Sequence, residues 1–272
     1  MKISIITINY NNSQGLEQTI ISVVRQNHAH YEYIIIDGGS TDGSVEVIKK
    51  YDKYITYWRS EPDGGIYDAM NKGVHYSQGD YLLFLNSGDV FYHDHIVSEA
   101  SSWLKGKDFY VGGMEYMFKK PRTIFPPRKV TAFYLFHKSL SHQATFIKSS
   151  LLKERPYDEN YRLVSDWEQM FYELVFNNRT YEPLPMVVSR FNTEGLSMNE
   201  GNVPIWKNEM EKVLRKTLPE RIYADYQIKD KYMLKILKAY HMKRGLAADW
   251  KILRNIIKKT VHDFIHLLPI VE

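Results

Sequence analysis

Residues 59–73 combine a glycine-rich turn with polar side chains in a pattern suited to binding an anion. A turn that contains proline and glycine leads there into a predicted helix, whose first backbone N–H groups are free to face an anion. Asp68, Asn71 and Lys72 stand at i, i+3 and i+4, so one helical face gathers a carboxylate, an amide and a cation. The same pattern would also suit a helix cap with a solvated face, so the neighbouring segments have to decide between the two.

Three more polar turns follow apolar runs that are predicted to be strands, at residues 2–9, 31–37 and 80–85. Parallel strands of an open α/β sheet place their carboxyl ends along one edge, and ligands bind at that edge. We therefore expect these turns and residues 59–73 to gather around one ligand site. The turns are Asn9-Tyr10-Asn11-Asn12-Ser13, Asp37-Gly38-Gly39-Ser40-Thr41-Asp42-Gly43 and Asn86-Ser87-Gly88-Asp89.

Strands and helices alternate along the first part of the chain, which predicts an α/β fold with a Rossmann-like, mostly parallel sheet flanked by helices. No G-x-G-x-x-G follows the first strand, and this disfavours a dinucleotide-dependent dehydrogenase. The second half is less regular, and beyond Pro204 the chain is predicted to be helical to its end. The pattern there predicts strands at 109–119, 141–147 and 186–191, a helix at 164–176 and a proline-rich loop at 120–129.

The composition, with 44% apolar and 25% charged residues among 272, is that of an ordinary soluble globular protein. There is no cysteine, so disulfides and thiolate metal sites are excluded. No run approaches the roughly eighteen apolar residues that would span a bilayer, and residues 1–10 read as a buried strand rather than a signal peptide. We therefore expect a cytoplasmic protein.

The charge is unevenly distributed. Residues 229–259 carry ten Lys/Arg and two Asp, a net +8, which leaves −4 on the rest of a chain whose total is +4. An amphipathic stripe runs through the last of these predicted helices, from Trp250 to Leu268, with lysine and arginine around it. Such a helix could lie on a membrane surface at the inner face of the membrane, or it could pack on the body or on a second subunit. A homodimer is therefore one option.

Five motifs in order make the chain resemble the family 2 glycosyltransferases, over roughly the first 195 residues. This resemblance implies a GT-A fold and transfer of a sugar from a nucleotide-sugar to an acceptor hydroxyl with inversion. It also implies a divalent cation, Mn²⁺ or Mg²⁺. The motifs are Thr7-x-Asn9-Tyr10-Asn11, Ile36–Gly43, Asp68–Gly73, Phe84–Asp89, and Ser141–Phe146 with Ser165–Glu168.

The resemblance assigns the donor to the first strand ends. Asp37 is expected to accept a hydrogen bond from a nucleobase N–H, or else to start an Asx turn. The family usually has two adjacent acids here, and in this chain the second position is Gly38. Tyr10 could equally be a packed turn residue. The remaining donor-binding candidates are Thr7, Asn9, Asp68, Asn71, Lys72, Asn86, Ser87, His142 and Gln143.

Asn86-Ser87-Gly88-Asp89 stands where the family carries its acidic "DXD" metal motif. Asp89 is the carboxylate that remains, and we expect it to ligate the cation, since hard cations take carboxylate and phosphate oxygens. With one acid left, the cation could bind weakly, or Lys72 and backbone N–H groups could neutralise more of the diphosphate. Asp89 could instead cap the helix that follows.

Asp166 is the predicted general base, because it matches the family's acid before an aromatic residue; it could instead serve only as a helix N-cap or first-turn acid. Glu168 lies elsewhere around the same helix and is the weaker candidate. His142 and Gln143 are expected to approach the diphosphate or the sugar, although a buried, hydrogen-bonded histidine is equally open. Arg190, Asn192 and Ser197 flank a loop that could close over the donor.

These assignments predict a catalytic GT-A domain at residues 1–200 and a helical extension at 201–272. The expected activity is transfer from a UDP- or GDP-linked sugar to a glycan or polyprenyl-linked acceptor in polysaccharide biosynthesis. One rival is a nucleotidyltransferase, which would need a cation in the turn after the first strand that residues 9–13 lack. Another rival is a nucleotide- or carbohydrate-binding protein that has kept the fold and lost catalysis. No nucleic-acid partner is expected, because no recognised motif accompanies the basic residues.

Overall fold

A computed structural model describes residues 1–27, 30–193 and 199–227. The chain divides into two compact units, Met1–Met210 and Glu211–Glu272. This division falls within helix α8 (Val203–Thr217), whereas the sequence placed it just before that helix. The predicted stripe from Trp250 to Leu268 lies outside the described residues. Within the described residues, no helix is both long and apolar enough to cross a membrane.

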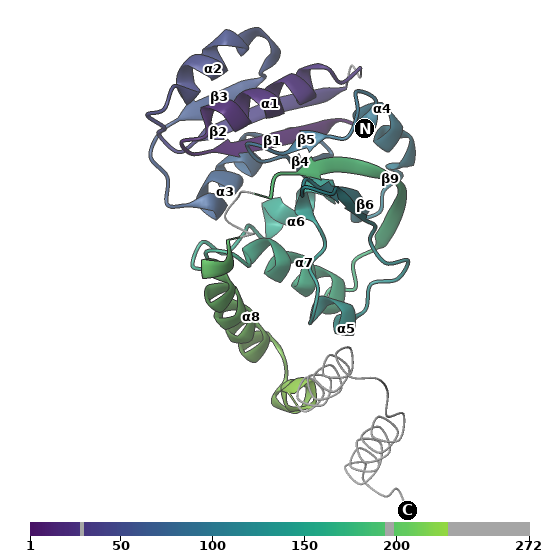
Figure 1. Cartoon of the computed structure of the whole chain (residues 1–272). Coiled ribbons are helices and arrows are strands. Elements are labelled where there is room, and N and C mark those ends of the chain that lie inside the picture. The colour runs from purple at the N-terminus through teal and green to yellow at the C-terminus, as the bar shows by residue number, and fades with distance from the viewer. Residues whose placement is uncertain (28–29, 194–198, 228–272) are drawn as a thin grey trace, which may run out of the picture. The chain divides into compact units, whose positions relative to one another are not determined.

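The first unit is built on a mixed sheet with helices on its faces (Figure 1). Its strands are β1 (Ile3–Asn9), β2 (Tyr31–Asp37), β3 (Tyr57–Ser60), β4 (Tyr81–Phe84), β5 (Val90–Phe91), β6 (Phe109–Tyr116), β7 (Arg122–Ile124), β8 (Thr145–Lys148) and β9 (Tyr181–Phe191). Its helices, besides α8, are α1 (Ser13–Val24), α2 (Ser44–Lys50), α3 (Ile66–Tyr76), α4 (Ile96–Trp103), α5 (Ala132–Leu135), α6 (Ser149–Glu154) and α7 (Ser165–Val175), with 3-10 turns at Asp52–Tyr54, His142–Ala144 and Glu200–Asn202.

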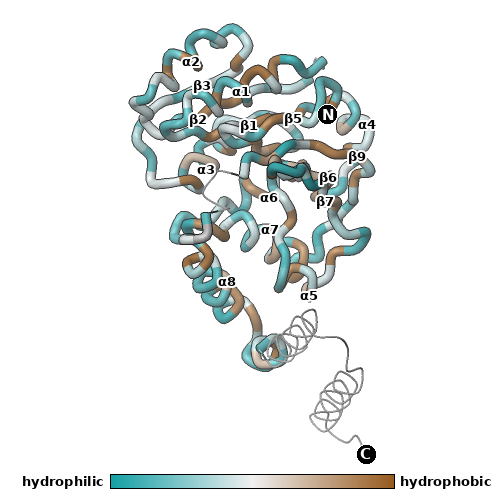
Figure 2. Tube along the Cα trace, in the orientation of Figure 1, coloured by the Kyte–Doolittle hydropathy of each residue, from teal (hydrophilic) through white to brown (hydrophobic). Residues whose placement is uncertain are grey.

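Among the described residues the sheet has nine strands, in the order β3-β2-β1-β4-β8-β6-β9-β5, with β7 paired to β6. β1 to β4 are parallel, and β8 runs antiparallel to its neighbours β4 and β6. The four parallel strands therefore end along one edge, as the sequence predicted. Figure 2 shows hydrophobic segments in the sheet and hydrophilic ones along the outer helix α2.

β1 is buried along its whole length because β2 and β4 flank it on both sides. Helix α3 contacts both β1 and β2. A Cβ on Gly73 would come within 2.4 Å of Cγ2 of Ile6, so only glycine permits this close approach of α3 to β1. Gly73 thereby sets the position of the helix that carries Asp68, Asn71 and Lys72.

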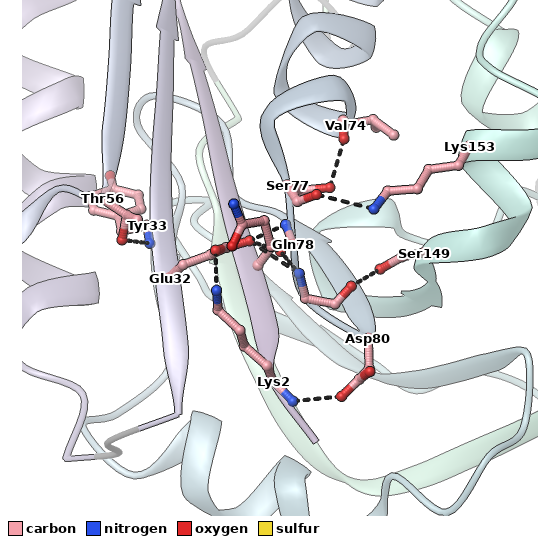
Figure 3. A network of polar contacts seen from close by, with 12 residues as sticks. Lys2, Glu32, Tyr33, Thr56, Val74, Ser77, Gln78, Asp80, Ser149 and Lys153 are labelled. Atoms are coloured by element: carbon pink, nitrogen blue, oxygen red, sulfur yellow. Dashed lines mark hydrogen bonds and ion pairs between the residues drawn. The ribbon is translucent and has the colours of Figure 1, made fainter.

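A buried carboxylate, Glu32, ties β2 to its neighbours near the start of that strand (Figure 3). Its oxygens accept from the Ser4 hydroxyl at 2.5 Å, from the Gly79 backbone N–H at 3.1 Å, from the Gln78 backbone N–H and from the Lys2 ammonium. Burial raises the pKa of Glu32, but Lys2, Ser4 and Gln78 outweigh that effect and hold it below its usual value.

Two local predictions in the second half are wrong. The proline-rich stretch 120–129, predicted as a loop, contains β7, which pairs with β6 from Tyr116↔Arg122 to Met114↔Ile124. The predicted strand at 141–147 begins with the turn His142–Ala144, and β8 starts only at Thr145. In both places the pairing partner β6, which local sequence does not reveal, decides where the strand begins.

Candidate active site

The carboxyl end of β2 is closed by a buried hydrogen-bonded cluster around Asp37. Its Oδ1 accepts from Asn9 Nδ2 at 2.7 Å and Ser40 Oγ at 2.6 Å, and its Oδ2 accepts from Ser60 Oγ at 2.6 Å and the Ser40 backbone N–H at 2.9 Å. Burial raises the pKa of Asp37, and these hydrogen bonds more than reverse the effect. Asp37 is 0% exposed. The side chain therefore braces the ends of β1, β2 and β3, and its contact with a nucleobase stays a prediction.

A second carboxylate, Asp63, lies over Gly38 beside this cluster. A Cβ built on Gly38 would stand 2.6 Å from Asp63 Oδ2 and 3.2 Å from Cδ2 of Tyr10. Asp63 is partly exposed and Tyr10 is 68% exposed. Burial raises the pKa of Asp63, while the Gly65 backbone N–H, bound at 3.0 Å, and the charge of Lys72 lower it. The space that a side chain at position 38 would fill is therefore occupied by a carboxylate from another loop.

The three residues on the predicted face of α3 do different things. Asp68 accepts from the Gly64 backbone N–H at 2.7 Å and from the Lys72 ammonium at 3.0 Å. Asn71 instead holds the segment at Tyr157, donating to its carbonyl at 2.9 Å and accepting from its N–H at 3.0 Å. Asp68 and Lys72 remain partly exposed near the strand ends, whereas the side-chain amide of Asn71 is hydrogen-bonded within the protein.

Asp89, the proposed metal ligand, is 3% exposed. Its Oδ1 accepts from the Asn192 backbone N–H at 2.9 Å. Burial raises its pKa to about 7, against smaller opposing effects of the Asn192 N–H, the His142 charge and Gln143. Three residues earlier, Oδ1 of Asn86 is buried and has no hydrogen-bond partner. Two hard oxygen donors thus lie in one tight turn, which the Asp89 backbone N–H closes by donating to the Asn86 carbonyl at 2.8 Å.

Asp166 is the centre of a hydrogen-bonded chain that joins three parts of the fold. Its Oδ1 accepts from the Tyr67 hydroxyl at 2.8 Å, and its Oδ2 lies 2.8 Å from His142 Nδ1. Nε2 of the same histidine is 3.3 Å from Asn86 Nδ2. Burial raises the pKa of Asp166, but the hydrogen bond and charge of His142 and the hydrogen bond from Tyr67 hold that pKa below its usual value. The group is therefore a carboxylate at neutral pH.

Asp166 and His142 also line a cavity of about 670 Å³. Its other walls come from the β6–β7 hairpin, the segment around α5 and the start of α8. Aromatic rings at Tyr116, Phe125, Tyr134 and Trp206 contribute to them. An aromatic-walled cavity with a carboxylate at one side suits a sugar ring next to a proton acceptor.

Other predicted residues have mixed placements. Thr7 is 0% exposed, and its hydroxyl donates to the Leu85 carbonyl at 2.7 Å. Direct contact between Thr7 and the nucleotide-sugar stays a prediction, and the burial of Thr7 does not favour it. Ser87 donates to the Asn12 carbonyl at 3.2 Å. Gln143 is buried beside Asp89.

The competing acid Glu168 forms an ion pair with Arg155 rather than facing the cavity. Arg190 is held by Glu115 at 2.8 Å. Ser197 lies outside the described residues.

Sequence reasoning missed two residues of this site, Asp63 and Tyr67. Both belong to the stretch 59–73, but Tyr67 reads as an apolar helix position and Asp63 as a turn residue. The absence of an acid at Gly38 was the signal that another carboxylate could stand there. No local signal links Tyr67 to Asp166, because the two are 99 residues apart in the chain.

Comparison with known proteins identifies the family. The family model "Glycosyl transferase family 2" matches residues 4–167. The chain belongs to glycosyl transferase family 2. The matched part contains the strand-end turns, His142 and Asp166, so the family assignment covers the whole candidate site except the cavity walls beyond residue 167.

Curated relatives include an uncharacterized glycosyltransferase of Mycobacterium tuberculosis, 38% identical over 61% of this chain and 66% of its own. A PGL/p-HBAD biosynthesis glycosyltransferase of Mycobacterium bovis is 27% identical over 69% of this chain and 72% of its own.

Among solved structures, S. aureus TarS in complex with UDP-GlcNAc has a TM-score of 0.65 at 17% identity, covering 99% of this chain and 82% of that chain. The mannosyltransferase PcManGT from Pyrobaculum calidifontis, in complex with GDP-Man and Mn²⁺, has a TM-score of 0.56 at 15% identity, covering 88% and 64%. At these identities the likeness shows the fold, which is the expected GT-A fold.

Proposed function

We propose that this protein is an inverting glycosyltransferase that moves a sugar from a nucleotide-sugar to a hydroxyl of a glycan or lipid-linked acceptor in polysaccharide biosynthesis. The observation that carries this proposal is Asp166, held as a carboxylate by Tyr67 and His142 at the wall of the cavity. Family membership and the nucleotide-sugars bound by TarS and PcManGT support it.

In the proposed reaction, the acceptor lies in the cavity and its hydroxyl oxygen attacks the anomeric carbon from the face opposite the nucleotide. The new C–O bond forms as the bond from that carbon to the diphosphate oxygen breaks, and the nucleoside diphosphate leaves with the electron pair. The hydroxyl proton passes to the Asp166–His142 pair. Tyr67 and His142 orient the carboxylate before the acceptor binds, and this lowers the entropic part of the activation barrier.

The donor lies, in this proposal, along the carboxyl edge of the parallel strands. Tyr10 supplies a ring face for the base, and Asp63 supplies the carboxylate for a base N–H, because Asp37 is buried and fully hydrogen-bonded. Asp68 and Lys72 stand at the rim of the same edge. The nucleotide-sugar is proposed to be a UDP- or GDP-linked sugar, as in the structural neighbours.

A divalent cation fits the turn 86–89. Among the described residues Asn86 Oδ1 is a buried oxygen without a hydrogen-bond partner, and burial raises the pKa of the Asp89 carboxyl three residues later. We infer that these two side chains would hold Mn²⁺ or Mg²⁺ together with donor phosphate oxygens. When bound, the cation would neutralise the diphosphate as it leaves.

The C-terminal unit, Glu211–Glu272, is proposed to contact a membrane surface or a second subunit, because residues 229–259 carry a net charge of +8. In the membrane case the enzyme would work at the inner face of the membrane. This part of the proposal is independent of the chemistry at Asp166.

The first test is a thermal-shift screen with UDP, GDP, CMP and TDP, each with and without Mn²⁺. A ligand that binds only the folded state raises Tm by mass action. We expect UDP or GDP to raise Tm, and to do so more with Mn²⁺. If none of the four nucleotides shifts Tm, the proposed donor site is wrong. Transfer by wild type and not by Asp166→Asn, with donor binding kept in both, would separate an enzyme from a binding protein on the same fold.

A further inference from the structure

Residues 117–138 form a surface unlike the rest of the described chain. The segment contains six Lys or Arg and no Asp or Glu. All six cations are exposed, and none of them takes part in an ion pair within residues 1–27, 30–193 and 199–227. They are Lys119, Lys120, Arg122, Arg128, Lys129 and Lys138. By contrast, Lys2, Lys50, Lys72, Arg155 and Arg179 elsewhere on this unit all pair with acids.

The same segment exposes apolar side chains. Five of the twelve large apolar residues exposed in the described part of the chain fall within it. They are Met117 at 38%, Phe118 at 43%, Ile124 at 41%, Phe125 at 53% and Phe133 at 39% exposure. Isolated exposed apolar residues are ordinary on soluble proteins, but a cluster of them marks a contact surface. We call residues 117–138 the hairpin surface, after β6 and β7 (labelled with α5 in Figure 2).

We propose that the hairpin surface docks the protein on an anionic lipid bilayer. The segment interleaves unpaired lysines and arginines with exposed aromatic and aliphatic side chains. These two kinds of side chain match the charged headgroup layer and the apolar layer beneath it. The cations meet the anionic headgroups, and the apolar side chains enter the boundary between headgroups and acyl chains. Because residues 117–138 hold six cations and no acid, their occupant has to supply negative charge as well as an apolar layer, and an anionic bilayer supplies both.

The position of the surface links docking to the site. Arg122, Ile124, Phe125 and Lys138 line the cavity that Asp166 and His142 also line, so the cavity has a wall in the docking surface. An acceptor with a membrane-embedded tail could then present its head to Asp166 without leaving the bilayer. That consequence rests on the proposed function, whereas docking itself can be measured without any transferase activity.

The test is cosedimentation of the full-length protein with vesicles of phosphatidylglycerol and phosphatidylcholine, and with vesicles of phosphatidylcholine alone. We expect binding to the anionic vesicles that weakens as salt rises, because screening shortens the range of the attraction. Lys119→Gln with Lys120→Gln should lower the partition coefficient about tenfold or more, given roughly a fivefold effect for each lysine near an anionic surface. Adding Phe118→Ser to this variant should lower the partition coefficient further.

A matched control removes the same charges elsewhere. Lys105 and Lys107 are exposed beside Trp103, which is itself 42% exposed. Lys105→Gln with Lys107→Gln should bind vesicles like the wild type. The basic C-terminal segment is tested separately by Lys258→Gln with Lys259→Gln.

Three results would overturn the proposal. The first is unchanged binding in the Lys119/Lys120 variant while the Lys258/Lys259 variant loses it. The second is an equal loss in the Lys105/Lys107 control. The third is a dimer that Phe118→Ser converts to a monomer, with no vesicle binding by the wild type, since the hairpin surface would then cover a second copy. Loss of vesicle binding with intact transfer to a soluble acceptor would leave the proposed function standing.

Discussion

Both edges of the parallel part of the sheet carry acids whose pKa is shifted by their surroundings, but the shifts have opposite directions. Near the start of β2, Glu32 is surrounded by donors and by the Lys2 ammonium, and its pKa falls below the usual value. At the other edge, Asp63 and Asp89 have raised pKa values because burial outweighs the donors around them. A carboxylate whose charge is satisfied inside the protein stabilises the fold, whereas burial that its partners do not fully offset destabilises it.

The contrast between these acids indicates where the protein gives up stability for function. Perturbed acids that face a cavity or a strand edge are candidates for ligand contact, while equally buried acids with complete partners are structural. By this criterion Asp37 groups with Glu32, although it stands at the ligand edge, since its four hydrogen bonds and its lowered pKa match the structural pattern. Asp166 is the exception, since its pKa is also lowered by its partners but it lines the cavity, where a ligand can reach it.

The largest effect is expected from Asp166→Asn. The amide cannot accept the acceptor proton, so the transfer rate should fall by about 10²–10⁴-fold, the usual contribution of a general base. Nucleotide affinity should stay within about twofold of wild type, because the donor edge is intact. Initial rates and calorimetric titration of the nucleotide would measure the two quantities. A variant that keeps more than about a tenth of the rate would show that the base lies elsewhere.

Asp63→Gly should weaken nucleotide binding by about tenfold or more, as expected for losing one charged hydrogen bond. The informative variant is the exchange of Gly38→Asp with Asp63→Gly, which moves the carboxylate to the neighbouring backbone. Gly38 does not have a positive φ, and the side chain that would clash with a new Cβ is removed in the exchange. We expect the exchange to recover most of the affinity. Equal affinity of wild type and Asp63→Gly would mean that Asp63 does not touch the donor.

Glu32→Gln should do the reverse, lowering stability and sparing nucleotide binding. Lys2 is 39% exposed, which weakens the pair, so we expect a loss of about 2 kcal/mol in the free energy of unfolding at pH 7. Because the folded pKa is lowered, this stabilisation is present above the usual pKa of 4.5 and is lost as the pH falls below it. Denaturant titrations at pH 7 and pH 3 measure both effects, and Glu46→Gln on exposed α2 is the neutral control.

The smallest expected effect is that of Mn²⁺ at Asp89. Burial raises its pKa from 3.8 to about 7, so the folded protein loses stability as the pH rises from about 4 to 7. Asp89→Asn should remove that loss and raise Tm at pH 8. In the wild type, Mn²⁺ at ten times its Kd should stabilise by about 1.4 kcal/mol at pH 8, and Asp89→Asn should abolish this. A Mn²⁺ effect that is the same in both proteins would place the cation elsewhere.

The parallel half of the fold could be predicted from the sequence because its strands are continuous apolar runs that end in polar turns. β2 has the bounds that the run 31–37 predicts, since a strand buried between two neighbours is apolar along most of its length. The family was also readable, because motifs such as Ile36–Gly43 and Phe84–Asp89 are local. The antiparallel half was harder, since the bounds of β7 and β8 depend on their distant partner β6.

Local sequence determined which residues are available at the ligand edge, because the turn after each strand is read directly from the chain. Only the tertiary structure decided what each of them does. In the folded protein, Asp37 lies in a closed hydrogen-bonded cluster, and Asp63 lies over Gly38. The fold also joins Tyr67 and His142 to Asp166, across 99 and 24 residues of chain. The charge and hydrogen-bonding of a buried carboxylate depend on neighbours within a few ångströms in space, and sequence distance does not record them.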